Sequence, residues 1–568
     1  MQKIAIIGGG PSALFTLKQF VKQNHLDFEI SIFEKARQLG AGMPYSQAGA
    51  NDEHVTNVSG NEIPELHMSV QEWIAIAPKE ILQHYNINQE NFNEYKVLPR
   101  LLFGKYLEAQ FAHYLLLARQ KGVKVDVFLN EEVINADFDK SENQVYLDTE
   151  KRAGLAYDYA IICIGHHWPC DFEGKIKGYF DSPYPPSKLQ LSVDFPVAIR
   201  GSSLTAIDAI RTLARHNGSF EQSDNGLITF KVSEKSKNFL MRLHSRSGLL
   251  PAVRFHLDDP HMFGHTYLSE DDIQKNMAIN NGFLSLDFVF DKAFKAAIFE
   301  KDPTFYQSIY KLNIEEFVLK MMELRETLDP FTLLAAEYKE ADKSIRRKET
   351  IYWKEMLGVL SFAMNQPAKH FSAEDMQRLQ NHLSHLISIV IAFIPQASAR
   401  ELLALHRAGV LEIISVGDQA SVKAGDEEGA VITYYENGKR YEEQYKLFID
   451  CIGQKHLPIH EFPLKKLVDN KHVSQAYLKF SDAEQAKKLQ NDSPSLLYKS
   501  GETDYYLRVS GITINDKFQL VDEFGAANPK LYMMAVPYIS GYNPDYSGLD
   551  FCSAASEVIV NSLLNKLN

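Results

Sequence analysis

The sequence predicts an α/β protein in which two similar strand–turn–helix units are combined with a large helical insertion. Three observations support this prediction. A glycine-rich turn follows an apolar strand near residue 3, a second turn of the same kind follows the strand that begins at Val197, and residues 269–407 carry a mainly helical pattern. The chain has 568 residues, 45% of them hydrophobic, which is enough for several domains with cores of their own.

The first turn has the spacing Gly8-x-Gly10-x-x-Ala13 and leads directly into an apolar helix. In such a turn the first glycine turns the chain tightly, the second admits a pyrophosphate, and the small third residue lets helix and strand pack. The next strand ends at Glu34, where a carboxylate accepts ribose hydroxyls. We therefore expect a dinucleotide here, although a glycine turn in another α/β unit is the alternative. The expected contacts are Gly8, Gly10, Pro11, Ser12, Ala13, Glu34 and Lys35.

The second turn reads Gly201-x-Ser203-x-x-Ala206, and Ser203 replaces the middle glycine. Its Cβ would crowd a pyrophosphate. The following strand ends in Ser245-Arg246, and a hydroxyl beside a guanidinium suits the 2′-phosphate of NADPH better than the free hydroxyl of NADH. The alternatives are a solvated Arg246 or a second fold that has lost its nucleotide. The expected contacts are Gly201, Ser202, Ser203, Thr205 and Arg246.

Two further segments, 157–165 and 445–453, share one pattern of an aromatic residue, a charge, an apolar strand and a glycine. Each lies downstream of one glycine turn, so each is expected to return the chain over a bound dinucleotide. Gly165 and Gly453 would allow the tight exits, while a plain strand that ends in a turn explains either segment alone.

Composition excludes several other classes of protein. A formal net charge of −13 disfavours a nucleic-acid partner, and no apolar run approaches the length of a membrane span. The four cysteines form neither a metal spacing nor a disulfide framework. The first strand begins at residue 3, so we expect no targeting peptide ahead of it. We expect a soluble cytoplasmic protein, with oligomer formation left open.

Several stretches together resemble a known family, the flavoproteins with two dinucleotide-binding domains. More narrowly, the chain is similar to the bacterial FAD-NAD(P)-binding group, near the amino-acid N-hydroxylating and class B-type flavin monooxygenases. The resemblance implies two Rossmann-like domains that bind FAD and NADPH. The stretches that carry it are Gly8 to Ala13, Glu34, Gly40 to Ser46, His54 to Asn57, Leu98 to Tyr106, Ile162 to Pro169, Gly201 to Asp208, Ser245 to Pro251 and Asp450 to Gly453.

The resemblance also implies roles for single residues. Gly42 and Met43 would run along the flavin. Arg100 would approach the FAD phosphates or adenine, with a surface salt bridge as the alternative, and Val133 would lie against the adenine or in the core. The other residues expected to bind a cofactor are Asn57, Gly165, His166, Gly453 and Gly548.

The family pattern is not matched everywhere. After the last strand, flavoproteins of this class carry Gly-Asp, but here the strand ends in Val536-Pro537, and the loop 538–548 is expected to wrap the isoalloxazine instead. His166 and His167 are expected to pack in the exit loop rather than to act as acid–base catalysts.

The stretch 254–265 contains histidines and aspartates that could suggest a metal site. Pro260 and Gly264 would break any helix that aligned His261 with His265, so we expect no metal and favour a polar loop facing the substrate.

Expected domain limits follow from these pieces: 1–185 and 455–568 for the FAD domain, 190–255 and 400–454 for the NAD(P) domain, and 256–399 for the helical insertion. The expected function is an FAD- and NADPH-dependent oxidoreductase, most simply a monooxygenase that oxygenates a small molecule with molecular oxygen through a flavin–oxygen adduct. In such chemistry the cofactor carries the reaction, which explains why no catalytic acid–base pair stands out. The alternatives are an NAD(P)H:acceptor reductase and a non-catalytic flavin-binding protein with a degenerate second site.

Overall fold

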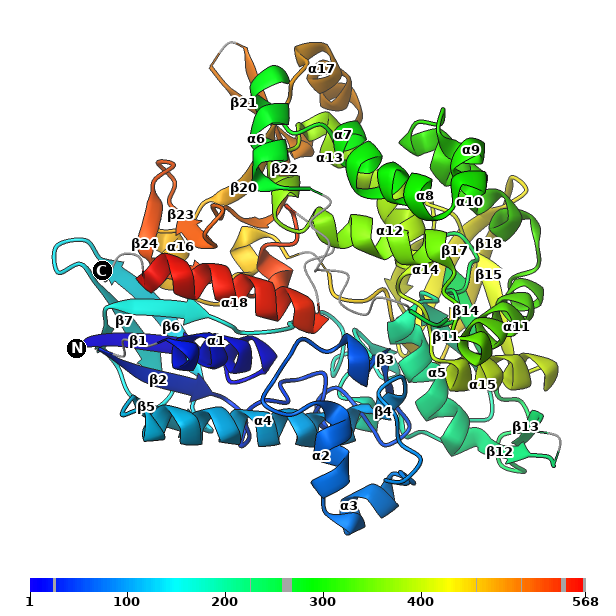
Figure 1. Ribbon diagram of the computed structural model, residues 1–568. Coiled ribbons are helices and arrows are strands. Elements are labelled where there is room, and N and C mark those ends of the chain that lie inside the picture. Colours follow the sequence, from blue (N-terminus) through cyan, green and yellow to red (C-terminus); the bar gives the residue numbers. More distant parts are fainter. Residues whose placement is uncertain are drawn as a thin grey trace.

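The computed structural model describes residues 1–23, 27–224, 226–257, 268–455, 457–501, 503–542 and 548–564. Two parallel β-sheets, each flanked by helices, form its two halves (Figure 1). We call the half with the six-stranded sheet the first fold and the half with the five-stranded sheet the second fold. The predicted α/β architecture with a helical insertion is confirmed, while the domain limits stay predictions.

The sheet of the first fold has the strand order β23-β24-β9-β1-β2-β5 and is parallel except for β23. Its central strands are buried on both faces, which is why they consist of nearly continuous apolar runs. The helices α1 and α18 lie side by side, as Figure 1 shows in blue and red. The elements are β1 (Gln2–Ile7), α1 (Pro11–Lys22), β2 (Phe28–Glu34), α4 (Arg100–Gln120), β5 (Lys124–Leu129), β9 (Tyr159–Ile162), β23 (Gln519–Val521), β24 (Ala527–Met533) and α18 (Gly548–Leu564).

The sheet of the second fold has the order β10-β19-β11-β14-β15 and is parallel throughout. The position of β11 between β14 and β19 repeats the position of β1 between β2 and β9. The elements are β10 (Tyr179–Phe180), β11 (Pro196–Arg200), α5 (Leu204–Asn217), β14 (Leu240–Ser245), α15 (Gln396–Arg407), β15 (Leu411–Ser415) and β19 (Phe448–Asp450).

Each fold also contains a three-stranded antiparallel sheet just before its closing strand. One leads into β9 and the other into β19, so the shared pattern of residues 157–165 and 445–453 has a common structural basis: the aromatic residue ends the antiparallel sheet and the closing strand follows. The strands are β6 (Val133–Asp139), β7 (Gln144–Thr149), β8 (Leu155–Tyr157), β16 (Ser421–Ala424), β17 (Ala430–Glu436) and β18 (Lys439–Tyr445).

The helical insertion lies between β14 and α15, inside the crossover that links β14 to β15. Most of its buried side chains join the core of the first fold, but those of α11 join the core of the second fold. A π-helical turn, Leu379–Leu383, interrupts the helical pattern of residues 269–407. The helices are α6 (Glu270–Ile279), α7 (Leu286–Phe290), α8 (Ala296–Lys301), α9 (Pro303–Ile309), α10 (Ile314–Thr327), α11 (Pro330–Arg347), α12 (Tyr352–Ala363), α13 (Ala373–Arg378) and α14 (Ser384–Val390).

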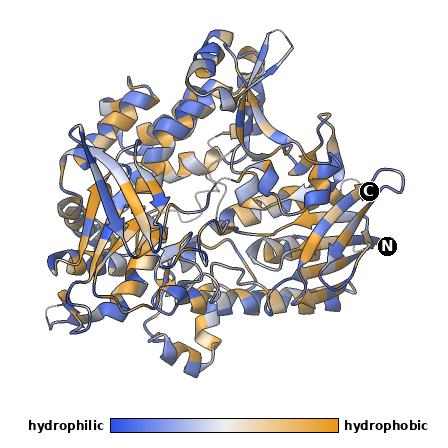
Figure 2. Ribbon diagram, turned by 180° about the vertical axis from the view of Figure 1, so that it is seen from behind, coloured by the Kyte–Doolittle hydropathy of each residue, from blue (hydrophilic) through white to orange (hydrophobic). Residues whose placement is uncertain are grey.

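The remaining elements are excursions from the two sheets. Residues 218–222 and 228–232 pair as two antiparallel strands. Figure 2 shows the parallel strands mainly in hydrophobic colours, as expected for buried sheets. These elements are β3 (Val55–Ser59), α2 (Val70–Ile76), α3 (Lys79–His84), β4 (Val97–Pro99), β12 (Gly218–Gln222), β13 (Ile228–Val232), α16 (Lys465–Asp469), β20 (Gln475–Lys479), α17 (Ala483–Asp492), β21 (Leu497–Ser500) and β22 (Asp504–Ile512).

Candidate functional site

The first glycine turn lies between the carboxyl ends of β1, β2 and β9. The Gly8 N–H donates to the carbonyl of Phe33 (2.8 Å), and the Cys163 N–H donates to the carbonyl of Ile7 (2.7 Å). Gly8 has φ +105°, and a Cβ there would lie 2.3 Å from the Cys163 carbonyl oxygen. Only glycine fits this position, because both the backbone conformation and the neighbouring strand exclude a side chain.

Glu34 is held against this turn by backbone donors. Its carboxylate accepts the N–H of Gly9 at 2.6 Å and that of Ala36 at 2.7 Å. The acidic group therefore stands at the end of β2, directly beside the glycine turn. This is the place where a carboxylate contacts the ribose of a dinucleotide that lies across the turn.

The loop around Gly42 packs on the outer side of the turn. The Gly40 N–H donates to the carbonyl of Gly9 (2.7 Å), and Gly42 has φ +58°. A Cβ on Gly10 would lie 3.3 Å from the Gly42 Cα. The turn and the loop that contains Met43 thus approach each other closely through glycines.

The C-terminal helix α18 packs along α1 and contacts the turn through side chains. The hydroxyl of Ser12 and the thiol of Cys552 are 3.3 Å apart, and Ala13 is fully buried. Burial raises the pKa of Cys552 to about 11, so this thiol stays protonated near neutral pH and serves packing. Gly548 begins α18 with φ +75°.

The second glycine turn repeats this backbone arrangement. The Gly201 N–H donates to the carbonyl of His244 (2.9 Å), and the Cys451 N–H donates to that of Arg200 (2.8 Å). Gly201 has φ +108°, and a Cβ there would lie 2.7 Å from the Cys451 carbonyl oxygen. The chain has therefore built the same strand–turn–helix geometry twice.

Side chains at the end of β14 differ from those at the end of β2. Ser245 stands where the first fold has Glu34, and its hydroxyl accepts a hydrogen bond from Ser202 (2.9 Å). Ser202 also lies 2.6 Å from the Leu249 carbonyl. Arg246 is 66% exposed and its Nε is 3.6 Å from a carboxylate oxygen of Asp418, so its guanidinium faces solvent beside the strand end.

Ser203 is the residue before α5 and is exposed. Its hydroxyl makes no cap hydrogen bond, whereas its carbonyl accepts the N–H groups of both Ala206 (2.9 Å) and Ile207 (3.1 Å). Thr205 lies on the side of α5 that faces Gly453, with its hydroxyl 3.8 Å from a Cβ built on that glycine.

The two exit loops that leave β9 and β19 are hydrogen-bonded to each other. The side chain of Gln454 accepts the N–H of His167 (3.0 Å) and donates to its carbonyl (2.6 Å). The Trp168 indole donates to the Gly453 carbonyl (3.2 Å), and the His166 ring is 3.3 Å from Gln454. Nothing in the sequence singled out Gln454, since a glutamine after a turn carries no local signal. Gly165 has φ +65° in the same loop.

Four further residues predicted to contact a cofactor have protein partners or core positions in the structure, and their contact with a cofactor stays a prediction. The guanidinium of Arg100 pairs with Asp208 of the second fold in a buried salt bridge rather than a surface one. The carbonyl of Asn57 accepts a hydrogen bond from Arg254 (2.6 Å). Val133 is buried in the core, and Lys35 is an exposed side chain 3.8 Å from Glu132.

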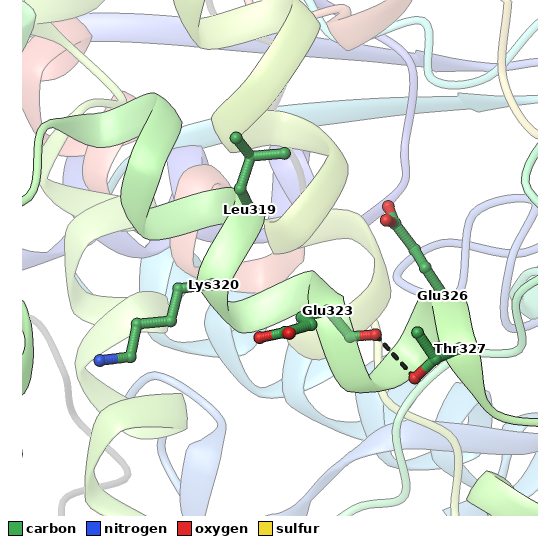
Figure 3. A pocket seen from close by; sticks show the side chains of 5 residues that line it. All are labelled: Leu319, Lys320, Glu323, Glu326 and Thr327. Atoms are coloured by element: carbon green, nitrogen blue, oxygen red, sulfur yellow. Dashed lines mark hydrogen bonds between the residues drawn. The ribbon is translucent and has the colours of Figure 1, made fainter.

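Other candidate sites receive no support. A shallow depression on α10 is lined by side chains of that single helix (Figure 3), so it has no opposing wall to hold a substrate. Within the described ranges no group of histidine, cysteine and acidic residues could hold a metal ion, and no helix there is long and apolar enough to cross a membrane. Most of the loop 254–265 and residues 543–547 of the loop 538–548 lie outside the described residues.

Comparison with known proteins identifies the family. Residues 5–167 match the FAD-NAD(P)-binding family, and residues 269–391 match the YdhS-like middle domain. The uncharacterized protein YdhS of Escherichia coli (strain K12) is 30% identical over 474 residues, which cover 82% of this chain and 86% of that protein. The chain belongs to the YdhS family. Its first part is an FAD-NAD(P)-binding domain, as the glycine turn predicted, and its helical insertion is the YdhS-like middle domain.

Solved structures that align with the whole chain have low sequence identity and TM-scores below 0.5. Ornithine hydroxylase PvdA from Pseudomonas aeruginosa aligns over 100% of both chains with 11% identity and a TM-score of 0.49. The ornithine N-hydroxylase KtzI of Kutzneria sp. 744 aligns over 100% of both chains with 12% identity and a TM-score of 0.46. Likenesses of this degree do not extend to a substrate.

Proposed function

We propose that this protein is an FAD-dependent, NADPH-using oxidoreductase that oxygenates a small molecule with molecular oxygen. The observation that carries the proposal is the pair of equivalent turns with different groups at their strand ends. Glu34 places a carboxylate at the first turn, whereas at the second turn the strand ends in Ser245, a buried hydroxyl bonded to Ser202, followed by the exposed cation of Arg246. A carboxylate suits free ribose hydroxyls, and a cation with a hydroxyl suits a 2′-phosphate.

The residues at the first turn fit FAD. Gly8 and Gly10 leave no Cβ between the turn and a pyrophosphate, and the first-turn N–H groups of α1 have no acceptor within the helix. In this proposal Ser12 and Ala13 contribute N–H donors, and the loop of Gly42 and Met43 lies along the flavin. Bound FAD would supply hydride acceptance and reaction with oxygen, while the chain orients it and excludes water.

The residues at the second turn fit NADPH less completely. Gly201 keeps the turn open, and Arg246 is free to exchange its exposed partner Asp418 for a phosphate. Ser203, however, places a side chain where the first turn has Gly10. This one difference favours the alternative of a flavin-binding protein whose second site is degenerate, and the experiment below separates the two.

The test is the visible spectrum of the purified protein, recorded without oxygen before and after addition of NADPH, and again after air is readmitted. We expect a flavin spectrum that NADPH bleaches and that air restores, faster when the substrate is present. If NADPH bleaches the flavin but reoxidation by air yields only hydrogen peroxide with every compound tried, the protein is better described as a reductase. A flavin spectrum that neither NADPH nor NADH changes would overturn the proposal and leave a flavin-binding protein.

A further inference from the structure

A short piece of the first fold forms two buried polar contacts with the second fold. We call residues 53–62, which include β3, together with Arg100 at the start of α4, the bridging segment. One contact is made with α5, the helix that follows the second glycine turn. The other is made with Arg254, which lies in the chain that leaves β14.

In the α5 contact, Arg100 pairs with the carboxylate of Asp208. The same carboxylate oxygen accepts the hydroxyl of Tyr184 at 2.8 Å, and the Arg100 Nε donates to the Val55 carbonyl at 3.0 Å. The Asp208 side chain is only 6% exposed. Burial alone would raise the pKa of the Asp208 carboxyl, but the nearby Arg100 guanidinium outweighs it and holds the pKa below its ordinary value.

A second group of side chains extends this contact along α5. The imidazole Nε2 of His54 lies 3.1 Å from both the Asp208 carbonyl and the Thr212 hydroxyl, and that hydroxyl donates to Glu53 at 2.5 Å. Burial lowers the pKa of His54, so this ring is neutral near pH 7. Asp208 and Thr212 are four residues apart and therefore share one face of the helix.

In the second contact the second fold supplies the positive charge and the first fold the negative one. Arg254 pairs with Glu62, donates to the Ser59 hydroxyl at 2.7 Å and donates to the Asn57 carbonyl at 2.6 Å. Both charged side chains are buried, with 8% and 7% exposed. The arginine here comes from the second fold and the carboxylate from the first, which is the opposite of the Arg100–Asp208 pair.

Such pairs are costly to separate. A charge that loses its partner while still buried keeps its desolvation penalty without the compensating attraction, so both pairs resist any movement that opens the contact between the folds. Each arginine also makes hydrogen bonds in a fixed fork geometry, which restricts sliding as well as separation. By contrast, the exit loops are joined through a few hydrogen bonds of Gln454 and Trp168, which can be re-formed in water.

We propose that the reciprocal pairs Arg100–Asp208 and Arg254–Glu62 lock the second fold on the first, and so set the distance between the two dinucleotide sites. Asp208 lies on the helix that begins at the second turn, and Arg254 lies in the chain leaving the strand that ends at Ser245. The lock therefore acts on the elements that would carry NADPH. This inference rests on the proposed function for its catalytic consequence, but its structural part stands alone. In this inference the four residues are positioning residues, because their charged groups are paired with one another.

The test measures the distance between the folds directly. Spin labels are attached to cysteines that replace exposed Arg119 in α4 and exposed Glu221 in β12, in a Cys170→Ser background, because Cys170 is the exposed cysteine and the other three are buried. Double electron–electron resonance then reports the distance distribution. The variants are Glu62→Gln, Asp208→Asn and their combination. The matched control is Glu401→Gln, which breaks a buried pair with Arg211 inside the second fold.

We expect a single narrow distance distribution for the labelled protein that keeps both native pairs and for its Glu401→Gln variant. Each single variant should broaden it, and the double variant should add a second, longer distance. A folded double variant with an unchanged distribution overturns the lock. If the double variant does not fold, the two single variants decide, because each removes the charge of one carboxylate and leaves its buried arginine unpaired. Unchanged distributions in both folded single variants overturn the lock equally.

The catalytic consequence is measured separately, as the rate of flavin reduction at saturating NADPH. We expect the Glu62→Gln and Asp208→Asn variants to be slower by about tenfold or more, with the Kd for NADPH nearly unchanged, because misplacement by about an ångström has effects of this size. Broadened distances with a normal rate would overturn the positioning role. A wild-type flavin that NADPH never reduces would overturn the proposed function, and the distance distributions would still decide the lock.

Discussion

The first and second glycine turns share a backbone and differ in a few side chains. In both, the N–H of the first glycine donates to the carbonyl of the second-to-last residue of the neighbouring strand. The N–H of the cysteine after the closing strand donates to the carbonyl of the last residue before the turn. In both, a positive φ and a nearby carbonyl demand glycine, at Gly8 and at Gly201. The scaffold for binding a dinucleotide is therefore independent of which dinucleotide is bound.

The differences lie at three equivalent positions. Glu34 corresponds to Ser245, Phe33 to His244, and Gly10 to Ser203, as the strand registers show. Phe33 stacks on Phe128 at 5.0 Å, whereas His244 is buried against the hydroxyl of Tyr445 at 3.1 Å. We therefore expect the choice of ligand and the response to pH to depend on the residues at the ends of β2 and β14 and on the residue before the helix of each turn.

The largest expected effect comes from filling the first turn. In Gly10→Val, the added Cβ meets Gly42 and the branched side chain projects toward the pyrophosphate, so we expect loss of nearly all bound flavin. The flavin-to-protein ratio of the purified variant measures this. Ser203→Val is the matched change in the second turn and should keep its flavin. A fully yellow Gly10→Val protein would contradict FAD binding at this turn.

The next effect concerns stability against acid. Burial lowers the pKa of His244 to about 4, below its unfolded value of 6.5. As the pH falls below 6.5, this histidine binds a proton in the unfolded state but not in the folded state, so the free energy of unfolding decreases. For this group we expect a loss of about 2 kcal/mol between pH 7 and pH 5. Urea unfolding at both pH values measures it.

His244→Phe places in the second fold the residue that the first fold has at this position. The variant should lose less stability than the wild type between pH 7 and pH 5, by about the same 2 kcal/mol, whatever its stability at pH 7. If both proteins lost the same stability, His244 would be taking up its proton as readily in the folded state as in the unfolded state.

Arg246→Ala tests the difference in ligand at the strand ends. Removal of one charge-assisted hydrogen bond to a phosphate should weaken NADPH by about tenfold and leave NADH nearly unchanged. Isothermal titration with the two nucleotides measures this ratio. Equal losses for both would place the recognition of the 2′-phosphate elsewhere. Asp418→Asn, which removes the present partner of Arg246, should tighten NADPH slightly.

The smallest effect comes from making the two turns alike. Ser203→Gly removes the Cβ at the second turn, and we expect about threefold tighter binding of NADPH, since a small side chain at the rim costs only a few tenths of a kcal/mol to about 1 kcal/mol. Weaker binding would show that the Ser203 hydroxyl is itself a contact, and no change would show that the pyrophosphate does not approach this residue.

Much of the fold was predictable from sequence because its signals are local. Both glycine turns, the two closing strands and the helical nature of residues 269–407 rest on periodicity and on glycine spacing within short windows. The helical pattern of residues 269–407 did not indicate the π-helical turn Leu379–Leu383, because such a turn depends on packing that a periodic pattern does not record.

The contacts between the folds were not predictable in the same way. Arg100 has the residue type and helix-start position of a phosphate ligand, and only the structure shows that Asp208 holds its guanidinium. The partner lies far away in the chain, and a single sequence contains no signal for such a pair. Glu62 and Arg254 likewise lacked any pattern, because a buried ion pair consists of two ordinary charged residues until the fold brings them together.

The insertion between β14 and α15 has a consequence for how the chain folds during synthesis. The strand β15 pairs with β14 only after the whole insertion has left the ribosome, and β9 waits still longer for its neighbour β24. We therefore expect the first fold, which begins at β1, to be completed only after the second fold, which is inserted within it along the chain. Until then the apolar edge of β9 is open to other chains, so this protein should depend on chaperones more than its two simple folds would suggest.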